Sequence, residues 1–189
     1  AEFNYEQIKS AGAIKLITIC PHCVRTIAED WKEIGAEVQI EHHSEFLARN
    51  IGRLPADSDR VEIVFHDPCY LGRYRGSYEE PREVVDRSNR VKEPSRTRER
   101  SFCCGAGGGL VFLGEEAGTR VNHERAKQLP DTGAPGIGAA CPFSNTMFRD
   151  ALAQISPNPP KLLDVAQIAA ASLSASSAPV TEPRPSGSD

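Results

Sequence analysis

The chain has 189 residues, enough for one well-packed core or for one and a half small α/β units. Hydrophobic residues make up 39% and charged residues 25% of it, as in ordinary globular proteins. The formal net charge of −4 argues against a nucleic-acid-binding protein, whose affinity depends on a clustered basic surface. No run of 18 apolar residues occurs, so these residues are not expected to span a membrane.

Hydrophobic periodicity predicts alternating strands and helices along the chain. Short β-branched runs that end at a cysteine or a polar turn are typical of strands, and longer amphipathic segments are typical of helices. In chain order we expect elements at residues 13–19 (strand), 24–34 (helix), 38–42 (strand), 44–51 (helix), 61–65 (strand), 78–88 (helix), 115–128 (helix), 136–140 (strand), 145–155 (helix) and 164–174 (helix). This order predicts an α/β fold with small, mostly parallel sheets flanked by helices.

Some residues have expected roles at the boundaries of these elements. Gly35 is expected to end the first long helix, and Ser44 is expected to cap the next one. His42 and His43 fit strand-end packing and capping better than metal binding, because no cysteine lies near them in sequence. Residues 87–100 are expected to form a solvated loop and an edge strand. The Arg and Lys residues between 82 and 100 are expected to form a solvated face, with a docking patch for an acidic electron donor as the alternative.

Six cysteines are the most distinctive feature of the composition. The adjacent pair Cys103 and Cys104 cannot easily form a disulfide within itself, but both thiolates can face one soft inorganic centre. Cys69 is separated from this pair by 33 residues, and the pair is separated from Cys141 by 36 residues. The spacing therefore predicts a metal centre with the ligands Cys69, Cys103, Cys104 and Cys141.

The residues around these cysteines indicate how the centre would be held. The glycines after the pair, Gly105, Gly107 and Gly108, would let backbone N–H groups approach the sulfurs. His66 lies close before Cys69, where it would either tune the centre by hydrogen bonding or cap the next turn.

Two other fates of the cysteines have to be weighed. Four thiolates also satisfy zinc, but zinc sites mostly use two C-x-x-C knuckles, so an iron–sulfur centre is favoured and zinc is the alternative occupant. Disulfides would require an oxidising compartment, and no secretory signal is present, so metal ligation in a reducing compartment is expected.

An internal repeat relates the two ends of the chain. A shift of 121 residues places residues 20–23 (CPHC) on residues 141–144 (CPFS), and the apolar strands before them align as well. With a one-residue gap, the expected caps Ser44 and Asp164 also coincide. We interpret this as two copies of one α/β unit. The predicted organisation is the C-terminal end of a first unit (1–57), a complete second unit (58–174) and a disordered tail (175–189).

The first copy also contributes candidate metal ligands. Cys20 and Cys23 stand in its C-x-x-C turn, and their partner cysteines would lie before Ala1. We therefore expect a parent chain with a further Cys-Cys-Gly motif upstream.

Three motifs together resemble the cysteine-rich CCG domain of heterodisulfide reductases and related iron–sulfur proteins. They are FHDPCYLGR at residues 65–73, SFCCGAGGG at 101–109 and CPF at 141–143, within a resemblance that covers residues 13–172. The CPHC turn and the HHSEFL stretch at 42–47 are most similar to iron–sulfur oxidoreductases linked to electron-transfer flavoprotein. The resemblance implies a [4Fe-4S] centre, which some members hold with five cysteines in a non-cubane form. In this chain the fifth position is Ser144, whose hard oxygen is a poor ligand for such a centre.

The resemblance also implies a function. The chain would be the C-terminal fragment of an oxidoreductase, inactive by itself, that passes electrons from a flavoprotein or a second cluster towards quinone. Upstream ferredoxin-like and membrane segments would place it on the cytoplasmic side, at the inner face of a membrane. No catalytic residue is assigned. One alternative is a heterodisulfide reductase-type catalytic domain, whose cluster cleaves a disulfide, and another is a zinc-stabilised, non-catalytic interaction module.

Overall fold

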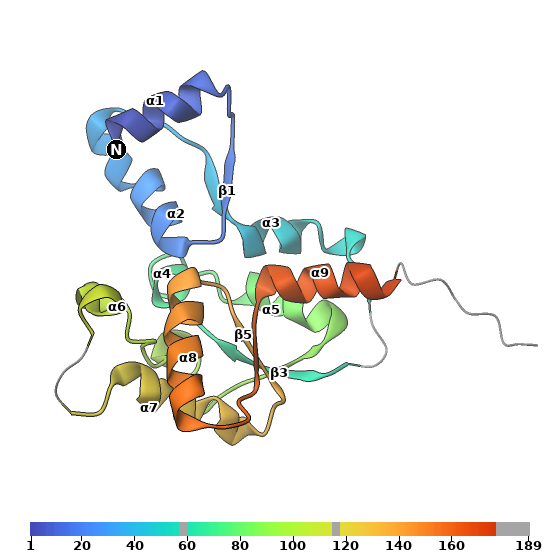
Figure 1. The fold of residues 1–189 in the computed structure, drawn as a ribbon. Coiled ribbons are helices and arrows are strands. Elements are labelled where there is room, and N and C mark those ends of the chain that lie inside the picture. Colours follow the sequence, from blue (N-terminus) through green and yellow to red (C-terminus); the bar gives the residue numbers. More distant parts are fainter. Residues whose placement is uncertain (57–59, 115–117, 177–189) are drawn as a thin grey trace, which may run out of the picture.

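The computed structural model describes residues 1–56, 60–114 and 118–176, with side chains as far as residue 174. These residues form two separate sheets, both entirely parallel, with helices packed around them (Figure 1). The α/β class with small parallel sheets is therefore confirmed. From residue 177 onward, the expected disordered tail lies outside the described residues.

The larger sheet has the strand order β4-β3-β5-β6. The two central strands are β3 (Glu62–His66) and β5 (Gly136–Ala139), which pair in a register that sets His66 opposite Ala139. The outer strands are β4 (Arg90–Lys92), which is the predicted edge strand, and β6 (Lys161–Asp164). Because β3 and β5 are neighbours and parallel, the loops that follow them leave the sheet at the same edge.

Helices cover both faces of this sheet. Ile63 and Phe65 point to the face covered by α5 (Glu79–Ser88) and α9 (Val165–Ser176), and Val64 points to the opposite face. That opposite face is covered by α7 (Val121–Gln128) and α8 (Pro142–Ile155). A strand that is buried on both faces needs an almost continuous apolar sequence, which explains the three consecutive apolar residues 63–65 in β3.

The N-terminal segment carries the smaller sheet. Its strands β1 (Leu16–Thr18) and β2 (Ile40–His42) pair with Leu16 opposite Ile40. In Figure 1 this segment, blue to cyan, lies above the larger sheet, with α3 beside α9. Its helices are α1 (Glu2–Ser10), α2 (Pro21–Ala28), η1 (Asp30–Ile34), α3 (His43–Arg49) and η2 (Ile51–Arg53).

Short helices fill the remaining connections. They are α4 (Cys69–Gly72), η3 (Arg98–Arg100), η4 (Gly107–Gly109), α6 (Leu110–Leu113) and η5 (Pro130–Thr132). In the described parts of the chain, no helix combines the length and the apolar character that crossing a membrane would require.

The structure reproduces the predicted repeat. The order β1-α2-β2-α3 recurs as β5-α8-β6-α9, and each first helix has a cysteine as N-cap and a proline in its first turn. The pairing of Leu16 with Ile40 recurs as the pairing of Ile137 with Leu162. The first partner is shifted by 121 residues and the second by 122, so the second copy is one residue longer between its strands.

The helix caps correct one detail of this alignment. His42, not Ser44, is the N-cap of α3: its side chain accepts a hydrogen bond from the Ser44 N–H, and Glu45 accepts from the His42 N–H. Asp164 does the same for α9, accepting from the Ala166 N–H. His42 therefore corresponds to Asp164. The predicted match of Ser44 with Asp164 was wrong, because the extra residue lies in the second copy and not in the first. Strand-end packing and capping by the histidine pair are confirmed.

Three other boundaries differ from the prediction. The helix expected at 24–34 is α2 followed by the 3-10 helix η1, and it ends at Gly35 as predicted, with φ of 72°. The charged helix expected at 115–128 begins only at Val121, and residues 115–117 lie outside the described residues. The helix expected at 145–155 begins at Pro142, directly after Cys141, because proline is well suited to a first helical turn.

Candidate metal centre

Two of the predicted ligands follow adjacent strands of the larger sheet. Cys69 opens α4 after β3, and Cys141 is the N-cap of α8 after β5. In parallel sheets the carboxyl ends of the strands are where ligands gather. Cys141 is buried, whereas Cys69 is half-buried.

The pair Cys103 and Cys104 lies in the glycine loop, with Cys103 exposed and Cys104 buried. The backbone turns back at Gly105, whose φ is 87°, and its N–H lies 3.3 Å from the Cys103 sulfur as a hydrogen-bond donor. The Gly107 N–H also donates to Cys103, and the Ala106 N–H donates to Cys104. The N–H groups of Gly105 and Gly107 thus both approach the Cys103 sulfur. Gly108 has a φ of 63° and is exposed.

Gly105 fits its position for a second reason. A Cβ at this residue would lie 2.9 Å from the Asn122 backbone nitrogen, a distance at which the backbone of α7 would have to move. The Asn122 side chain in turn donates to Met147 O at 3.1 Å and so joins α7 to α8. The glycine therefore allows the cysteine loop to lie directly on α7.

The serine at the fifth position also lies at this site. Ser144 is buried and hydrogen-bonds with the thiols of both Cys104 and Cys141. Serine thus links the buried thiol of the loop to the thiol that follows β5.

The thiols differ in acidity. A hydrogen bond from Cys104 lowers the pKa of Cys103 to about 6, whereas the same contact raises the pKa of Cys104. Burial raises the pKa of Cys141 to about 11. Burial, with the charge of Cys103, also raises the pKa of Cys69. Cys103 is therefore the first thiolate to form, and positive charge at the site would be needed to deprotonate the others.

The donor set fits an iron–sulfur cluster better than a single ion. Within the described residues, no three His, Cys, Asp or Glu side chains converge closely enough to hold one metal ion. The candidate ligands differ in burial, from the exposed Cys103 to the buried Cys104 and Cys141. A cluster carries its thiolates on several irons, so it spaces them more widely than a single tetrahedral zinc ion does.

The cysteines of the first copy lie beside the second. His22 places its Nδ1 3.9 Å from the Cys20 sulfur and 4.0 Å from the Cys141 sulfur. Its ring stacks on Tyr70 at 3.9 Å, so it is held between the two copies. Cys23 is exposed, and Cys20 and Cys23 both line an open pocket of about 630 Å³. Burial is the main cause that raises the pKa of Cys23 to about 11.

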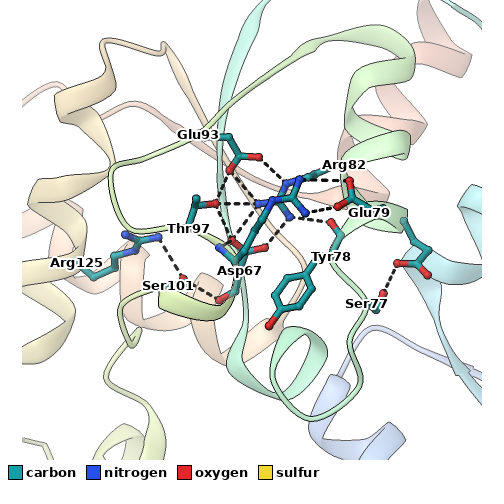
Figure 2. A network of polar contacts seen from close by, with 11 residues as sticks. Asp67, Ser77, Tyr78, Glu79, Arg82, Glu93, Thr97, Ser101 and Arg125 are labelled. Atoms are coloured by element: carbon teal, nitrogen blue, oxygen red, sulfur yellow. Dashed lines mark hydrogen bonds and ion pairs between the residues drawn. The ribbon is translucent and has the colours of Figure 1, made fainter.

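A buried polar network joins the Cys69 turn to the segment before Cys103 (Figure 2). Asp67 accepts hydrogen bonds from both terminal nitrogens of Arg82, at 2.7 and 3.0 Å, and from the Arg98 N–H at 2.7 Å. Arg82 also pairs with Glu93, and Ser101 donates to the Asp67 carbonyl. The solvated face predicted for the basic residues between 82 and 100 is therefore wrong for Arg82, which is buried because two carboxylates compensate its charge.

His66 is connected to this network through Arg125, which contacts both His66 and Ser101. Its Nδ1 accepts a hydrogen bond from Arg125 Nε at 3.3 Å, and its ring meets Phe148 edge-on at 4.7 Å. Burial holds the pKa of His66 well below its usual range, so the ring is neutral. The structure shows His66 facing Arg125 and Phe148. Among the described residues no hydrogen bond joins it to a cysteine.

Sequence reasoning missed three residues of this site. Arg73 and His22 lie next to predicted ligands, but nothing in a single sequence shows which way such side chains turn. Arg125 belongs to the segment that was expected to form a charged helix, and its side chain is completely buried. Its contacts with His66 and Ser101 span 59 and 24 residues, so no local signal could have found them.

Comparison with known proteins gives a family match and several relatives. Residues 63–149 match the family described as CCG, cysteine-rich domain. The chain is 36% identical over 179 residues to the "Probable iron-sulfur-binding oxidoreductase FadF" of Bacillus subtilis, covering 92% of this chain and 25% of that protein. It is 34% identical to the EtfAB:quinone oxidoreductase of Syntrophomonas wolfei, covering 87% of this chain and 25% of that protein.

A third relative belongs to a different enzyme. It is one of the subunits of the dihydromethanophenazine:CoB–CoM heterodisulfide reductase of Methanosarcina acetivorans, and it is 35% identical over 79% of this chain and 39% of its own length. The chain thus spans about a quarter of the length of the first two relatives and well under half of the third.

Proposed function

The chain belongs to the cysteine-rich CCG domain family through residues 63–149, and from this premise we propose that it holds an iron–sulfur cluster through which an oxidoreductase passes electrons. The observation that supports this proposal is that Cys69 and Cys141 follow adjacent strands of a parallel sheet, while Cys103 and Cys104, in the glycine loop, already receive backbone N–H groups. Cys69, Cys103, Cys104 and Cys141 would be the ligands. When bound, such a cluster accepts and releases one electron at a time.

The chain's own residues would determine how this centre behaves. The N–H groups of the glycine loop donate to the sulfurs, which favours the more reduced, more negative state of a cluster. The start of α8 directs its N-terminal N–H groups at Cys141, where the helix dipole favours a thiolate. Burial of Cys104 and Cys141 keeps water from one side, and exposure of Cys103 leaves the other side open to a partner.

The names of the relatives support a direction for the electrons. One relative is named as an EtfAB:quinone oxidoreductase and another as an iron-sulfur-binding oxidoreductase. We infer a flavoprotein, such as electron-transfer flavoprotein, or a second cluster as the donor, and quinone as the final acceptor. Because quinones are membrane-soluble, the parent protein would work at the cytoplasmic face of a membrane. Ferredoxin-like and membrane segments would belong to the rest of the parent, and residues 1–57 to a first CCG unit.

A second candidate function is heterodisulfide reduction, because one relative is part of a heterodisulfide reductase. In that function the cluster itself would react with a disulfide. The five-cysteine centre implied for some members needs a thiolate where this chain has the buried Ser144. A four-thiolate [4Fe-4S] cluster that only transfers electrons is therefore favoured here. A zinc-stabilised interaction module is the remaining alternative.

Anaerobic reconstitution of the chain with iron and sulfide tests these functions against one another. We expect a brown protein that contains equal amounts of iron and sulfide, is reduced by one electron and is reoxidised by a quinone. Cleavage of an added disulfide by the reduced protein would instead support the heterodisulfide function. A colourless chain that retains zinc in preference to iron would contradict the electron-transfer proposal.

A further inference from the structure

Arg73 connects the two chain segments that carry the exposed part of the candidate centre. Its backbone N–H donates to the Cys69 carbonyl at 2.9 Å, at the end of α4. Its side chain reaches the other segment, where Nε donates to the Glu99 carbonyl at 3.1 Å and Nη2 donates to the Ser101 carbonyl. Ser101 stands two residues before Cys103. One residue thus ties the Cys69 turn to the start of the cysteine loop.

The charge of this guanidinium is not neutralised by a carboxylate. Among the described residues no Asp or Glu forms an ion pair with Arg73, and its two side-chain partners are both carbonyls. Neighbouring arginines differ: Arg75 pairs with Glu45, Arg82 with Asp67 and Arg98 with Glu79. The Arg73 guanidinium reaches the carbonyl of Ser101, two residues before Cys103, from the turn that begins at Cys69, so its charge lies beside the site itself.

We propose that Arg73 is a positioning residue of the metal centre, which clamps the Cys69 turn to the cysteine loop and whose unpaired charge stabilises the reduced centre. The second part rests on the proposed iron–sulfur function, whereas the clamp does not. A cation beside a cluster favours the state with the extra electron, so removing the cation should make the reduction potential more negative.

Lysine and glutamine separate the two roles. R73K keeps the positive charge but loses the planar fork that donates to two carbonyls in a fixed geometry. R73Q loses the charge and most of the reach. R75Q is the matched control. Arg75 lies two residues from Arg73 and pairs with Glu45, so this variant removes an equal charge that is already compensated. Since Arg73 is exposed, all three variants should fold, which circular dichroism and thermal melting would verify.

Two measurements decide the proposal. The first is the midpoint potential of the reconstituted protein, followed by electron paramagnetic resonance. We expect R73Q to bind its electron about tenfold less tightly, which corresponds to a shift of about 59 mV to more negative potential for a one-electron couple. R73K and R75Q should stay close to the wild type. A wild-type potential in R73Q, or an equal shift in R75Q, would overturn the electrostatic role.

The second measurement is hydrogen exchange at residues 99–104 of the metal-free protein, which needs no cluster. We expect faster exchange in both R73Q and R73K and unchanged exchange in R75Q. Wild-type exchange in both Arg73 variants would overturn the clamp. If the protein bound no cluster at all, the proposed function would fail, but the exchange experiment would still decide whether Arg73 holds the loop.

Discussion

Arg82 and Arg125 are both buried, but their charges are compensated differently. The Arg82 side chain is 6% exposed and pairs with Asp67 and Glu93, which raises its pKa above the usual value despite burial. Arg125 is fully buried and contacts His66, Ser101 and Gln128, all of them neutral partners. Burial lowers the pKa of Arg125 to about 10, which leaves it charged at neutral pH. Arg82 is thus fixed by its ion pairs and Arg125 by its packing.

Asp67→Asn tests the importance of the buried ion pair. The substitution would leave Arg82 without half of its compensating charge, so we expect a loss of about 3 kcal/mol in the free energy of unfolding. Glu79→Gln is the control, because it breaks an arginine pair whose carboxylate side chain is 64% exposed and should cost less than about 1 kcal/mol. Urea denaturation measures both. Equal effects of the two substitutions would show that the buried network does not stabilise the fold.

His42 gives the stability a defined pH dependence. It is fully buried, and burial lowers its pKa to about 4, against about 6.5 in an unfolded chain. Between these values the unfolded state binds the proton and the folded state does not, so stability falls as the pH falls from about 6.5 to about 4. This group contributes up to about 3 kcal/mol over the window.

His42→Asn should flatten that dependence, because asparagine can cap α3 without titrating. His66 remains in the variant and titrates with the same sign, so the slope should shrink but not vanish. Urea denaturation of both proteins at a series of pH values measures the effect. An unchanged slope in the variant would mean that His42 is not neutral in the folded protein.

At the scale of elements, the cysteine loop depends on its contact with α7. Gly105 adopts a φ of 87° and leaves no room for a Cβ against the Asn122 backbone. We expect Gly105→Ala to lower the melting temperature and to weaken the binding of iron, because the loop must move away from α7. Gly108→Ala is the matched control, since its φ is also positive but no atom lies near its Cβ position. Similar losses in the two variants would show that backbone strain alone explains the effect.

Some of these element boundaries could be predicted from the sequence and others could not. The strand–cysteine–proline–helix order was predictable because β-branched runs, proline at a first helical turn and Gly35 are local signals. The expected helix at 115–128 was too long, because polar composition alone does not distinguish a helix from the loop before it. The cap of α3 was assigned to Ser44 and not to His42 because histidine is a rare N-cap, and only the hydrogen bonds with Ser44 and Glu45 identify His42 as the N-cap. Burial of Arg82 depends on Asp67 and Glu93, which lie 15 and 11 residues away.

At the scale of the whole molecule, one polar contact joins the equivalent elements of the two copies. His43, next to the cap of α3, places its Nε2 3.0 Å from Asp164 Oδ1, and Asp164 is the cap of α9. Both side chains are at most 15% exposed, so the bond is shielded from water.

A double-mutant cycle with His43→Ala and Asp164→Ser measures this contact, since serine can still cap α9. We expect a coupling free energy of about 1 kcal/mol between the two substitutions in urea denaturation. Strictly additive effects would mean that the contact does not help to hold the two copies together.

The candidate site was predictable in part. The spacing of Cys69, Cys103, Cys104 and Cys141 indicated a shared centre. In the structure Cys69 and Cys141 follow adjacent parallel strands, and the pair lies in the glycine loop. The position of Cys20 beside Cys141, with His22 between them, was not predictable, because it depends on how two copies of the repeat pack against each other. The same holds for Arg73 and for the network around Asp67, whose partners come from distant segments.

The proposed iron–sulfur cluster has the four ligands Cys69, Cys103, Cys104 and Cys141. Its most direct test is the iron and sulfide content of the anaerobically reconstituted chain and of its single Cys→Ser variants, with Cys23→Ser as the control from the first copy. We expect the variants Cys69→Ser, Cys103→Ser, Cys104→Ser and Cys141→Ser each to lose most of the iron, sulfide and visible absorption, and Cys23→Ser to retain them. Full iron and sulfide in Cys104→Ser would contradict this assignment.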